Sequence, residues 1–101
     1  MPRSFADGAL ELRIRDDVAT LVLNRPDKRN ALTQALWRAL PDAVAVVEAD
    51  PAAKVMVLTG AGGHFAAGAD IGEFEVTYAT RDSAAAYAAE IARAMEAVAG
   101  L

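Results

Sequence analysis

The stretch that decides the fold runs from Val18 to Gly60 and reads VATLVLNRPDKRNALTQALWRALPDAVAVVEADPAAKVMVLTG. It contains VATLVL at residues 18–23 and KVMVLT at residues 54–59, two runs dominated by apolar and β-branched residues. Such runs are typical of strands that are covered on both faces. Between them, apolar residues recur at helical spacing. The order strand, helix, strand predicts a right-handed parallel crossover, so the sheet should be at least partly parallel.

The predicted helix between the two strands starts after Thr33, a suitable N-cap, and stops at Asp50 and Pro51. Pro41 lies inside it and cannot donate a hydrogen bond to the carbonyl of Trp37, so we expect a kink or a restart there. Trp37 is interpreted as a core residue. The apolar positions that define the helix are Leu36, Trp37, Leu40, Val44 and Val47.

The flanking segments continue the α/β pattern. Residues 10–15 read LELRIR, an alternation typical of a strand with one solvated face. With Asp16 and Asp17 as the turn, this strand and the next should form a hairpin at a sheet edge. A final helix should run from about Asp82 to Gly100. Its apolar face is expected to contain Tyr87, Ile91, Met95 and Val98.

Length and composition set the class of protein. The chain has 101 residues, the length of a single domain. Hydrophobic residues make up 54% of it and charged residues 24%, with a mean hydropathy of +0.20, which predicts a globule with a core and no membrane span. The formal net charge of −4 provides no global positive field for a nucleic acid or an anionic membrane. Any anion site must therefore be local.

Reactive side chains are scarce. The chain has no cysteine, which excludes a disulfide framework, a thiolate nucleophile and a zinc-thiolate site. His64 is the single histidine, which argues against a metal site and a Ser-His-Asp triad, and it is interpreted as an exposed loop residue. The N-terminal residues lack the continuous apolar stretch of a secretory signal, so we expect a cytoplasmic protein.

A loop rich in small residues follows the second predicted strand. Residues 60–71 read GAGGHFAAGADI, and such a segment lets a ligand approach backbone N–H groups that stabilise an anion or a developing oxyanion. The loop contains no Gly-Lys-Ser/Thr, and Phe65 stands where a Rossmann fingerprint has its third glycine. Spacing alone leaves a plain strand-to-helix connection as good an interpretation as a ligand loop.

A cationic loop follows the first of the two predicted parallel strands. Residues 23–32 read LNRPDKRNAL and place Arg25, Lys28 and Arg29 at the carboxyl end of that strand, where open parallel sheets bind ligands. These cations are suited to phosphates. A solvated charged loop is the simpler interpretation of this segment by itself.

Together the two loops resemble the enoyl-CoA hydratase/isomerase (crotonase) superfamily. LNRP at residues 23–26 with NAL at residues 30–32 is similar to the family's first CoA-binding loop. VLTG at residues 57–60 followed by FAAGADI at residues 65–71 is similar to its oxyanion segment. The resemblance implies an α/β, crotonase-like ββα spiral fold, of which residues 1–101 would be an incomplete N-terminal part.

The resemblance also implies a role for individual residues. The backbone N–H of Ala69 would be one of two donors to the oxygen of an acyl-CoA thioester. Arg25, Lys28 and Arg29 would serve CoA binding, the last two near its phosphates. Coenzyme A would be part of the substrate, with no separate cofactor and no metal, and the full-length protein would be a trimer or hexamer. The residues implied along the pantetheine and adenine are Ala31, Ala67, Gly68, Asp70 and Ile71.

The chain departs from the family pattern in two respects. Hydrating members carry two glutamates and the second oxyanion donor downstream of the matched region, so we expect this chain by itself to be inactive. Glu73 and Glu75 are interpreted as exposed loop or helix-end carboxylates, and Glu90 as a residue of the polar face of its helix. Gly72 stands where the family often has a basic residue, which weakens the electrostatic part of the CoA site.

These observations leave several functions open. The first expectation is an enoyl-CoA hydratase, which adds water across the double bond of a 2-enoyl-CoA, with an isomerase or another acyl-CoA enzyme of the superfamily as the alternative. A second class is a non-catalytic CoA-binding or assembly module that pairs with a chain carrying the missing half. A third is an unrelated small α/β domain whose glycine-containing loop is only a connection.

Overall fold

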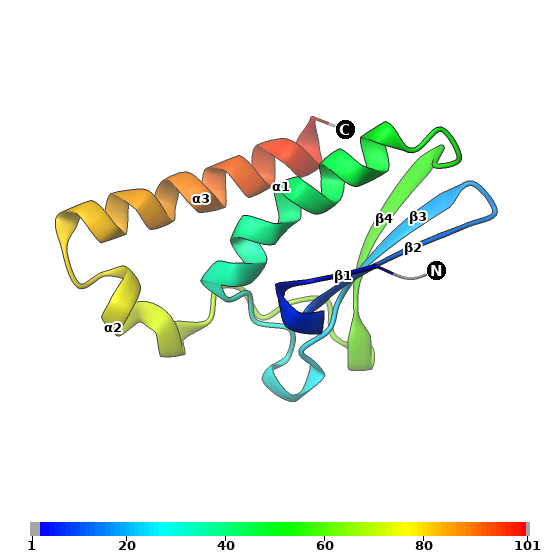
Figure 1. Ribbon diagram of the computed structural model, residues 1–101. Helices are drawn as coiled ribbons and strands as arrows, with labels where there is room; N and C mark the ends of the chain where they lie inside the picture. The colour runs from blue at the N-terminus through cyan, green and yellow to red at the C-terminus, as the bar shows by residue number, and fades with distance from the viewer. Residues whose placement is uncertain (1–2, 101) are drawn as a thin grey trace.

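The computed structural model describes residues 3–100, which form one sheet with two long helices on the same side of it (Figure 1). The strands are β1 (Arg3–Phe5), β2 (Leu10–Arg15), β3 (Val18–Leu23) and β4 (Val55–Gly60), in the sheet order β1-β2-β3-β4. The helices are α1 (Gln34–Ala49), α2 (Phe74–Thr77) and α3 (Arg81–Ala99). Single 3-10 turns occur at Ala6–Gly8, Pro26–Lys28, Ala61–Gly63 and Ile71–Glu73.

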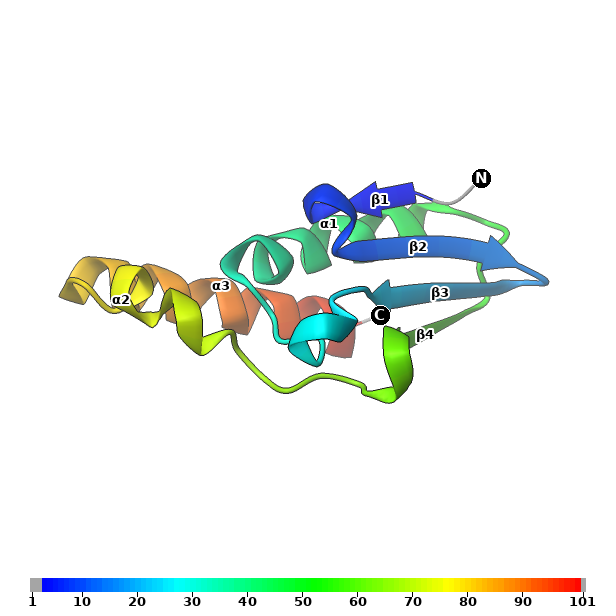
Figure 2. The ribbon, with the colours of Figure 1, turned by 90° about the horizontal axis from the view of Figure 1, so that it is seen from below.

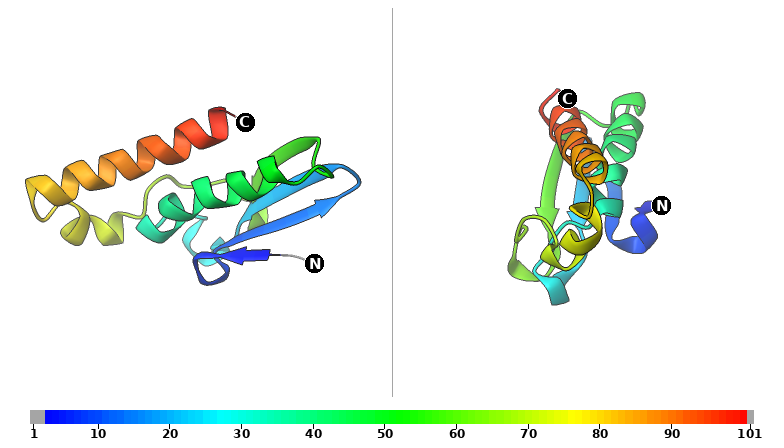
Figure 3. Two further views of the ribbon diagram at one scale, coloured as in Figure 1. Left: turned by 45° about the horizontal axis from the view of Figure 1, so that its top comes forward. Right: turned by 90° about the vertical axis from the view of Figure 1, so that its left-hand side faces the viewer.

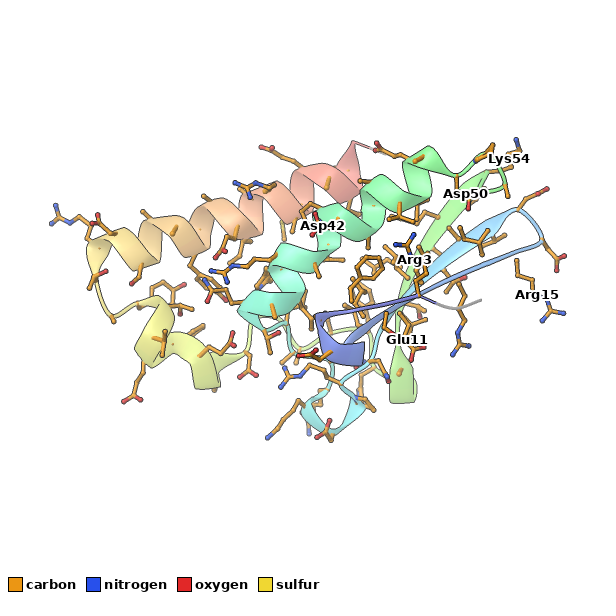
Figure 4. All side chains as sticks on the ribbon, viewed as in Figure 1. Arg3, Glu11, Arg15, Asp42, Asp50 and Lys54 are labelled. Atoms are coloured by element: carbon orange, nitrogen blue, oxygen red, sulfur yellow. The ribbon has the colours of Figure 1, made fainter. Side chains whose placement is uncertain are left out.

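The parallel crossover is confirmed, because β3 pairs with β4 in parallel from Val18↔Val55 to Leu23↔Gly60. The two strands therefore end together, and the loops that follow them leave the same edge of the sheet. Figure 4 places Arg15, Asp50 and Lys54 at the opposite end, where the β2–β3 turn meets the turn before β4. There the N–H of Lys54 donates to the carbonyl of Asp17 at 2.7 Å.

The β2–β3 hairpin is also confirmed, with Asp16 and Asp17 at φ 52° and 68° in its turn. Aspartate tolerates this left-handed region better than most residues. The expectation that the hairpin forms the sheet edge is wrong, because β1 pairs antiparallel with the first half of β2 (Figure 2). A strand of three residues is too short to show a sequence period, so β1 could not be predicted from its residues alone.

The core lies between the sheet and α1. Leu10 and Leu12 of β2 and alternate residues of β3 point inward and are buried, and the apolar stripe of α1 covers them. The expectation that residues 54–59 form a strand covered on both faces is wrong, because β4 has no buried residue and Val55 and Val57 are exposed. Trp37 is 8% exposed, which confirms it as a core residue. The other fully buried large apolar side chains of these elements are Leu10, Leu12, Leu21, Leu23, Leu36 and Val44.

Helix α1 begins at Thr33, whose hydroxyl accepts from the N–H of Leu36 at 3.1 Å. It runs through Pro41 as one helix, so of the two expected outcomes, a kink or a restart, the restart does not occur. Buried apolar residues lie on both sides of Pro41, at Leu40 and at Val44. Their packing stabilises the helix across Pro41 although one backbone hydrogen bond is missing.

Helix α3 packs on α1 rather than directly on the sheet, and its first half extends with α2 beyond the sheet (Figures 1 and 3). Thr80 and Ser83 form a capping box at its start. Tyr87 and Ala94 are buried, whereas Met95, expected on the same apolar face as Tyr87, is 61% exposed. Ala94, seven residues after Tyr87, continues the buried stripe instead. No helix within residues 3–100 has the length and apolar character needed to span a membrane.

Candidate functional site

The candidate site lies where β3 and β4 end. The first loop (residues 24–33) follows β3, and the second loop (residues 61–70) follows β4. Leu32 and Ala69 form an isolated parallel bridge between the two loops, which extends the β3–β4 pairing beyond the sheet. Ligands of open parallel sheets bind at this edge.

Asn30 joins the two loops from a fully buried position. Its Oδ1 accepts from the N–H of Arg25 at 2.8 Å, and its Nδ2 donates to the carbonyls of Ala61 and His64, each at 2.8 Å. Arg29 and Asn30 have φ of 52° and 57°, in the left-handed region where asparagine is one of the best tolerated residues. One amide side chain thus satisfies three backbone groups from both loops.

Arg25 forms the second link between the loops. Its Nη1 donates to the carbonyl of Ala31 at 2.6 Å and to Oδ2 of Asp70 at 3.0 Å. Both side chains of this ion pair are 21% exposed, so solvent screens the pair only in part. The guanidinium expected to serve CoA is therefore engaged within the chain.

Asp70 is held in its ionised form. Its Oδ1 accepts from the N–H of Gly72 at 2.8 Å, and this bond, together with the hydrogen bond and charge of Arg25, holds the pKa of Asp70 below its usual value although burial opposes the shift. The same contact caps the 3-10 turn Ile71–Glu73. Asp70 is thus a structural anion with both oxygens in use.

The bridge fixes the direction of the Ala69 peptide group. Leu32 donates its N–H to the carbonyl of Gly68 at 2.8 Å, and its carbonyl accepts from the N–H of Asp70 at 2.9 Å. In an extended segment, successive peptide groups point to opposite sides. The N–H of Ala69 therefore points away from the first loop. In the described part of the chain, no N–H of residues 65–69 donates a hydrogen bond to another residue.

Small residues keep the second loop open to a ligand. Ala67 and Gly68 are exposed, and Gly68 has φ +95°, a conformation that an L side chain rarely adopts. Ile71 is 77% exposed beside this segment. The loop thus offers accessible amides with little side-chain bulk around them.

The two remaining cations of the first loop, Lys28 and Arg29, are exposed. Neither is within ion-pair distance of a carboxylate in residues 3–100. Ala31 is half-buried between them and the bridge, and its carbonyl is occupied by Arg25. Of the three cations predicted to bind CoA, these two are available to an external anion.

An apolar cavity of about 400 Å³ opens beside both loops. Leu32 and Phe65 contribute to it from the loops, and Leu58 from β4. Its far side is formed by the last part of α3, including Met95 and Val98. The cavity can accept an apolar group next to the segment with the free amides.

The other candidate carboxylates are structural or exposed. Glu73 was expected to be exposed, but its Oε1 accepts from the N–H of Gln34 at 2.6 Å at the start of α1. Glu90 was expected on the polar face of its helix, but it accepts from Gln34 Nε2 at 2.7 Å and from Arg38. Glu73 does lie at a helix end, as expected, but both carboxylates are part-buried and bonded to α1, which a sequence pattern cannot show. Glu75 and His64 are exposed, as predicted.

The environment of Glu90 favours its ionised form. Burial of the carboxyl group opposes ionisation, but the hydrogen bonds from Arg38 and Gln34 together outweigh it and lower the pKa of Glu90. No group of three or more His, Asp or Glu side chains within residues 3–100 is arranged to hold a metal ion. The distinctive chemistry of the site therefore lies in its backbone amides and its two exposed cations.

Residues 13–98 match the sequence profile of the family described as Enoyl-CoA hydratase/isomerase. The chain belongs to this family. Hydroxycinnamoyl-CoA hydratase-lyase of Pseudomonas fluorescens is 46% identical over 65 residues, which cover 64% of this chain and 24% of that protein. The mitochondrial enoyl-CoA hydratase of Pongo abelii is 42% identical over 80 residues, which cover 72% of this chain and 28% of that protein.

Solved structures agree with this membership of the enoyl-CoA hydratase/isomerase family. A family protein from Hyphomonas neptunium superimposes with a TM-score of 0.85 at 45% identity, over 89% of this chain and 35% of that one. An enoyl-CoA hydratase/carnithine racemase from Magnetospirillum magneticum gives a TM-score of 0.83 at 40% identity, over 89% and 34% of the two chains. The α/β crotonase-like fold is confirmed, and an unrelated α/β domain is excluded.

This enoyl-CoA hydratase/isomerase family member spans about a quarter of the length of its curated relatives and about a third of the solved ones. Asn30 is a site residue whose role the sequence pattern does not predict, because the pattern identifies it only as a member of the motif NAL at residues 30–32. Its signal was an asparagine directly after three polar residues of a tight loop, a place where left-handed backbone is common. The pattern did not show that this residue is buried.

Proposed function

We propose that this family member acts on an acyl-CoA thioester as part of an enoyl-CoA hydratase, with the Ala69 N–H as one donor to the thioester oxygen. The observation that carries the proposal is the direction of this N–H, which the Leu32–Ala69 bridge turns away from the first loop. It donates to no other residue in the described part of the chain.

The chemistry requires such a donor. Hydroxide addition at the β carbon of a 2-enoyl-CoA moves electrons onto the thioester oxygen and gives an enolate, which then takes a proton at the α carbon. A fixed amide aimed at this oxygen stabilises the enolate more than the substrate, and one donor of this kind is typically worth about 10²–10³ in rate. Small side chains around Ala69 let the thioester reach it.

The rest of the CoA molecule would extend along the two loops. Lys28 and Arg29 are exposed cations suited to its phosphates. Ala67, Gly68 and Ile71 are exposed along the second loop, where pantetheine and adenine would lie. Ala31 and Asp70 would line the same path with their backbone, since Asp70 has both carboxylate oxygens engaged.

Hydration also requires an acid and a base, and the two carboxylates nearest to Ala69 in the sequence are already engaged. Asp70 is paired with Arg25, and Glu73 caps α1. We therefore expect that the 101-residue chain alone does not hydrate crotonyl-CoA. Loss of the ultraviolet enoyl absorbance at a rate above that of a Lys28→Ala/Arg29→Ala control would contradict this.

Binding is tested directly by amide NMR on the ¹⁵N-labelled chain. Titration with butyryl-CoA, which has a thioester carbonyl but no double bond, should shift the amide signals of Ala69 and its neighbours. Titration with CoA, which has no acyl group, should shift signals near Lys28 and Arg29 and leave Ala69 close to its free position. Equal effects of both compounds on Ala69, or no effect of either, would overturn the proposal.

Matched variants give the control for the phosphate contacts. Lys28→Ala/Arg29→Ala should weaken CoA binding about tenfold or more, since two charged contacts are lost. Arg13→Ala/Arg15→Ala removes the same charge from the opposite end of the sheet and should change the affinity less than about twofold. Equal losses in both variants would show a general charge effect instead of a local phosphate site.

Members of the family can differ in the reaction they catalyse on an acyl-CoA. The Pseudomonas fluorescens relative is a hydratase-lyase by name. Hydration, isomerisation and cleavage at an acyl-CoA share the enolate, so the proposed role of Ala69 is the same in each. Hydratase remains our proposal, and product analysis with the whole protein on 2-enoyl-CoA and 3-enoyl-CoA substrates separates it from an isomerase.

A second candidate is a non-catalytic CoA-binding or assembly module. The observation that favours it is the open apolar cavity together with the exposed side chains of Val55 and Val57 on β4. Exposed apolar surface of this kind favours association with another chain. A monodisperse monomer in light scattering, with no partner added, would count against this candidate.

A further inference from the structure

Two side chains of the first loop anchor the second loop on either side of its free amides. On the upstream side, Asn30 Nδ2 donates to the carbonyls of Ala61 and His64. On the downstream side, Arg25 Nη1 donates to Oδ2 of Asp70 at 3.0 Å. The segment between these anchors, residues 65–69, has no N–H bonded to another described residue. Its position therefore depends on what holds its two ends.

The two anchors form one unit. The N–H of Arg25 donates to Oδ1 of Asn30, and the N–H of Asn30 donates to the carbonyl of Arg25, both at 2.8 Å. The second loop also lies close to the end of β4, because a Cβ added at Gly60 would meet the carbonyl oxygens of His64 and Phe65 at 2.1 and 2.2 Å. The path of the loop is thus fixed by close contacts as well as by the anchors.

The positive charge of Arg25 also affects the N–H of Ala69. Asp70 directly follows Ala69, and an uncompensated carboxylate there would oppose the negative charge that develops on the thioester oxygen. The Arg25 guanidinium beside it balances that charge. Its contact with the carbonyl of Ala31 also fixes the guanidinium from the first-loop side.

We propose that Arg25 is a positioning residue for the Ala69 donor. It fixes the second loop through Asp70 and balances the charge of that carboxylate, and it is not a ligand of the CoA phosphates. This inference rests on the proposed function. It gives Arg25 a different role from Lys28 and Arg29, although the sequence groups the three cations together.

The first test measures hydrogen exchange in the free chain. The N–H groups of Leu32 and Asp70 form the bridge between the loops, so their exchange reports its opening. Arg25→Met should speed both about tenfold, and Arg25→Lys, which keeps the charge, should have a smaller effect. Arg38→Met, which breaks the ion pair with Glu90 between α1 and α3, should leave both rates unchanged. Unchanged rates in Arg25→Met would overturn the anchoring role.

The second test separates positioning from phosphate binding. Butyryl-CoA labelled with ¹³C at the thioester carbonyl reports how strongly the bound carbonyl is polarised. In Arg25→Met, the bound signal should return towards its position in free butyryl-CoA, while the Kd for CoA without an acyl group changes less than about twofold. A retained carbonyl signal with a Kd for CoA weakened as in Lys28→Ala/Arg29→Ala would overturn the proposal.

The two tests distinguish a failure of the proposed function from a failure of the anchoring role of Arg25. A wild-type chain that binds neither compound overturns the proposed function, and the exchange rates then decide the anchoring role by themselves. If circular dichroism shows that Arg25→Met does not fold, Arg25→Lys carries both comparisons, because it retains a cation beside Asp70. Exchange and carbonyl signal in Arg25→Lys identical to those of the wild type would then count against the geometric role of the guanidinium.

Discussion

Asn30 is the residue on which the geometry of the two loops most depends. It is fully buried, it adopts a left-handed backbone conformation, and its side chain bonds to three backbone groups. A buried polar group that loses its partner costs more free energy than the bond itself contributes. The loops should therefore respond strongly to any change at this position.

Asn30→Ala should lower the free energy of unfolding by about 3 kcal/mol, since three backbone groups lose their partner and alanine is less tolerant of positive φ. Urea denaturation of the chain measures this loss. Asn24→Ala is the matched control, because Asn24 is exposed and its side chain donates one hydrogen bond, of 3.3 Å, to the carbonyl of Gly8. Equal losses in the two variants would contradict the anchoring role of Asn30.

Glu90 gives a prediction for pH dependence. Its pKa is lowered in the folded chain, so the ionised carboxylate stabilises the folded state. This contribution is present above the ordinary pKa of 4.5 and is lost as the pH falls through the lower, folded-state value. The stability difference between the wild type and Glu90→Gln should therefore shrink from about pH 7 to about pH 3 in urea unfolding. Glu75→Gln, at an exposed position, should keep the wild-type profile.

At the scale of elements, α1 lacks one backbone hydrogen bond because Pro41 lies inside it. Proline leaves the carbonyl of Trp37 without its helical donor, yet the helix continues because its apolar stripe is packed against the sheet. Tertiary packing thus overrides local preference in this element.

Pro41→Ala should raise the free energy of unfolding by about 1–2 kcal/mol, because the helical hydrogen bond gained exceeds the added entropy of the unfolded chain. Thermal or urea unfolding checks this. Pro51→Ala, placed after the helix ends, adds no helical bond and should be neutral or slightly destabilising. Destabilisation by Pro41→Ala would indicate that the proline ring itself packs in the core.

At the scale of the whole molecule, the helices and the sheet leave one apolar side open. The cavity of about 400 Å³ lies between the end of α3, β4 and the two loops, and Met95 at its rim is 61% exposed. Exposed apolar surface favours association in water.

The chain should therefore self-associate with rising concentration in sedimentation or light scattering. Met95→Glu should lower this association, because a carboxylate at the rim resists desolvation. Val76→Glu is the control, since Val76 is 72% exposed on α2 but does not line the cavity. Equal effects of the two substitutions would show that net charge, and not the cavity, controls association.

Sequence alone determined the elements whose signal is local. The runs at residues 18–23 and 54–59 and the alternation at residues 10–15 predicted β3, β4 and β2, and helical spacing predicted α1 and α3. The motifs of the two loops predicted the family. Each signal repeats within a few residues or stands at a fixed spacing, so it can be read without knowing what the segment packs against.

Only the tertiary structure decided what the polar side chains do. Arg25 meets Asp70 across 45 residues of sequence, Glu73 meets Gln34 across 39, and Glu90 meets Gln34 across 56. Periodicity shows that a residue is polar but not which partner the fold brings to it. The direction of the Ala69 N–H likewise follows from its bridge to Leu32. These contacts form only when the chain has folded, since loop closure over such separations has no local signature.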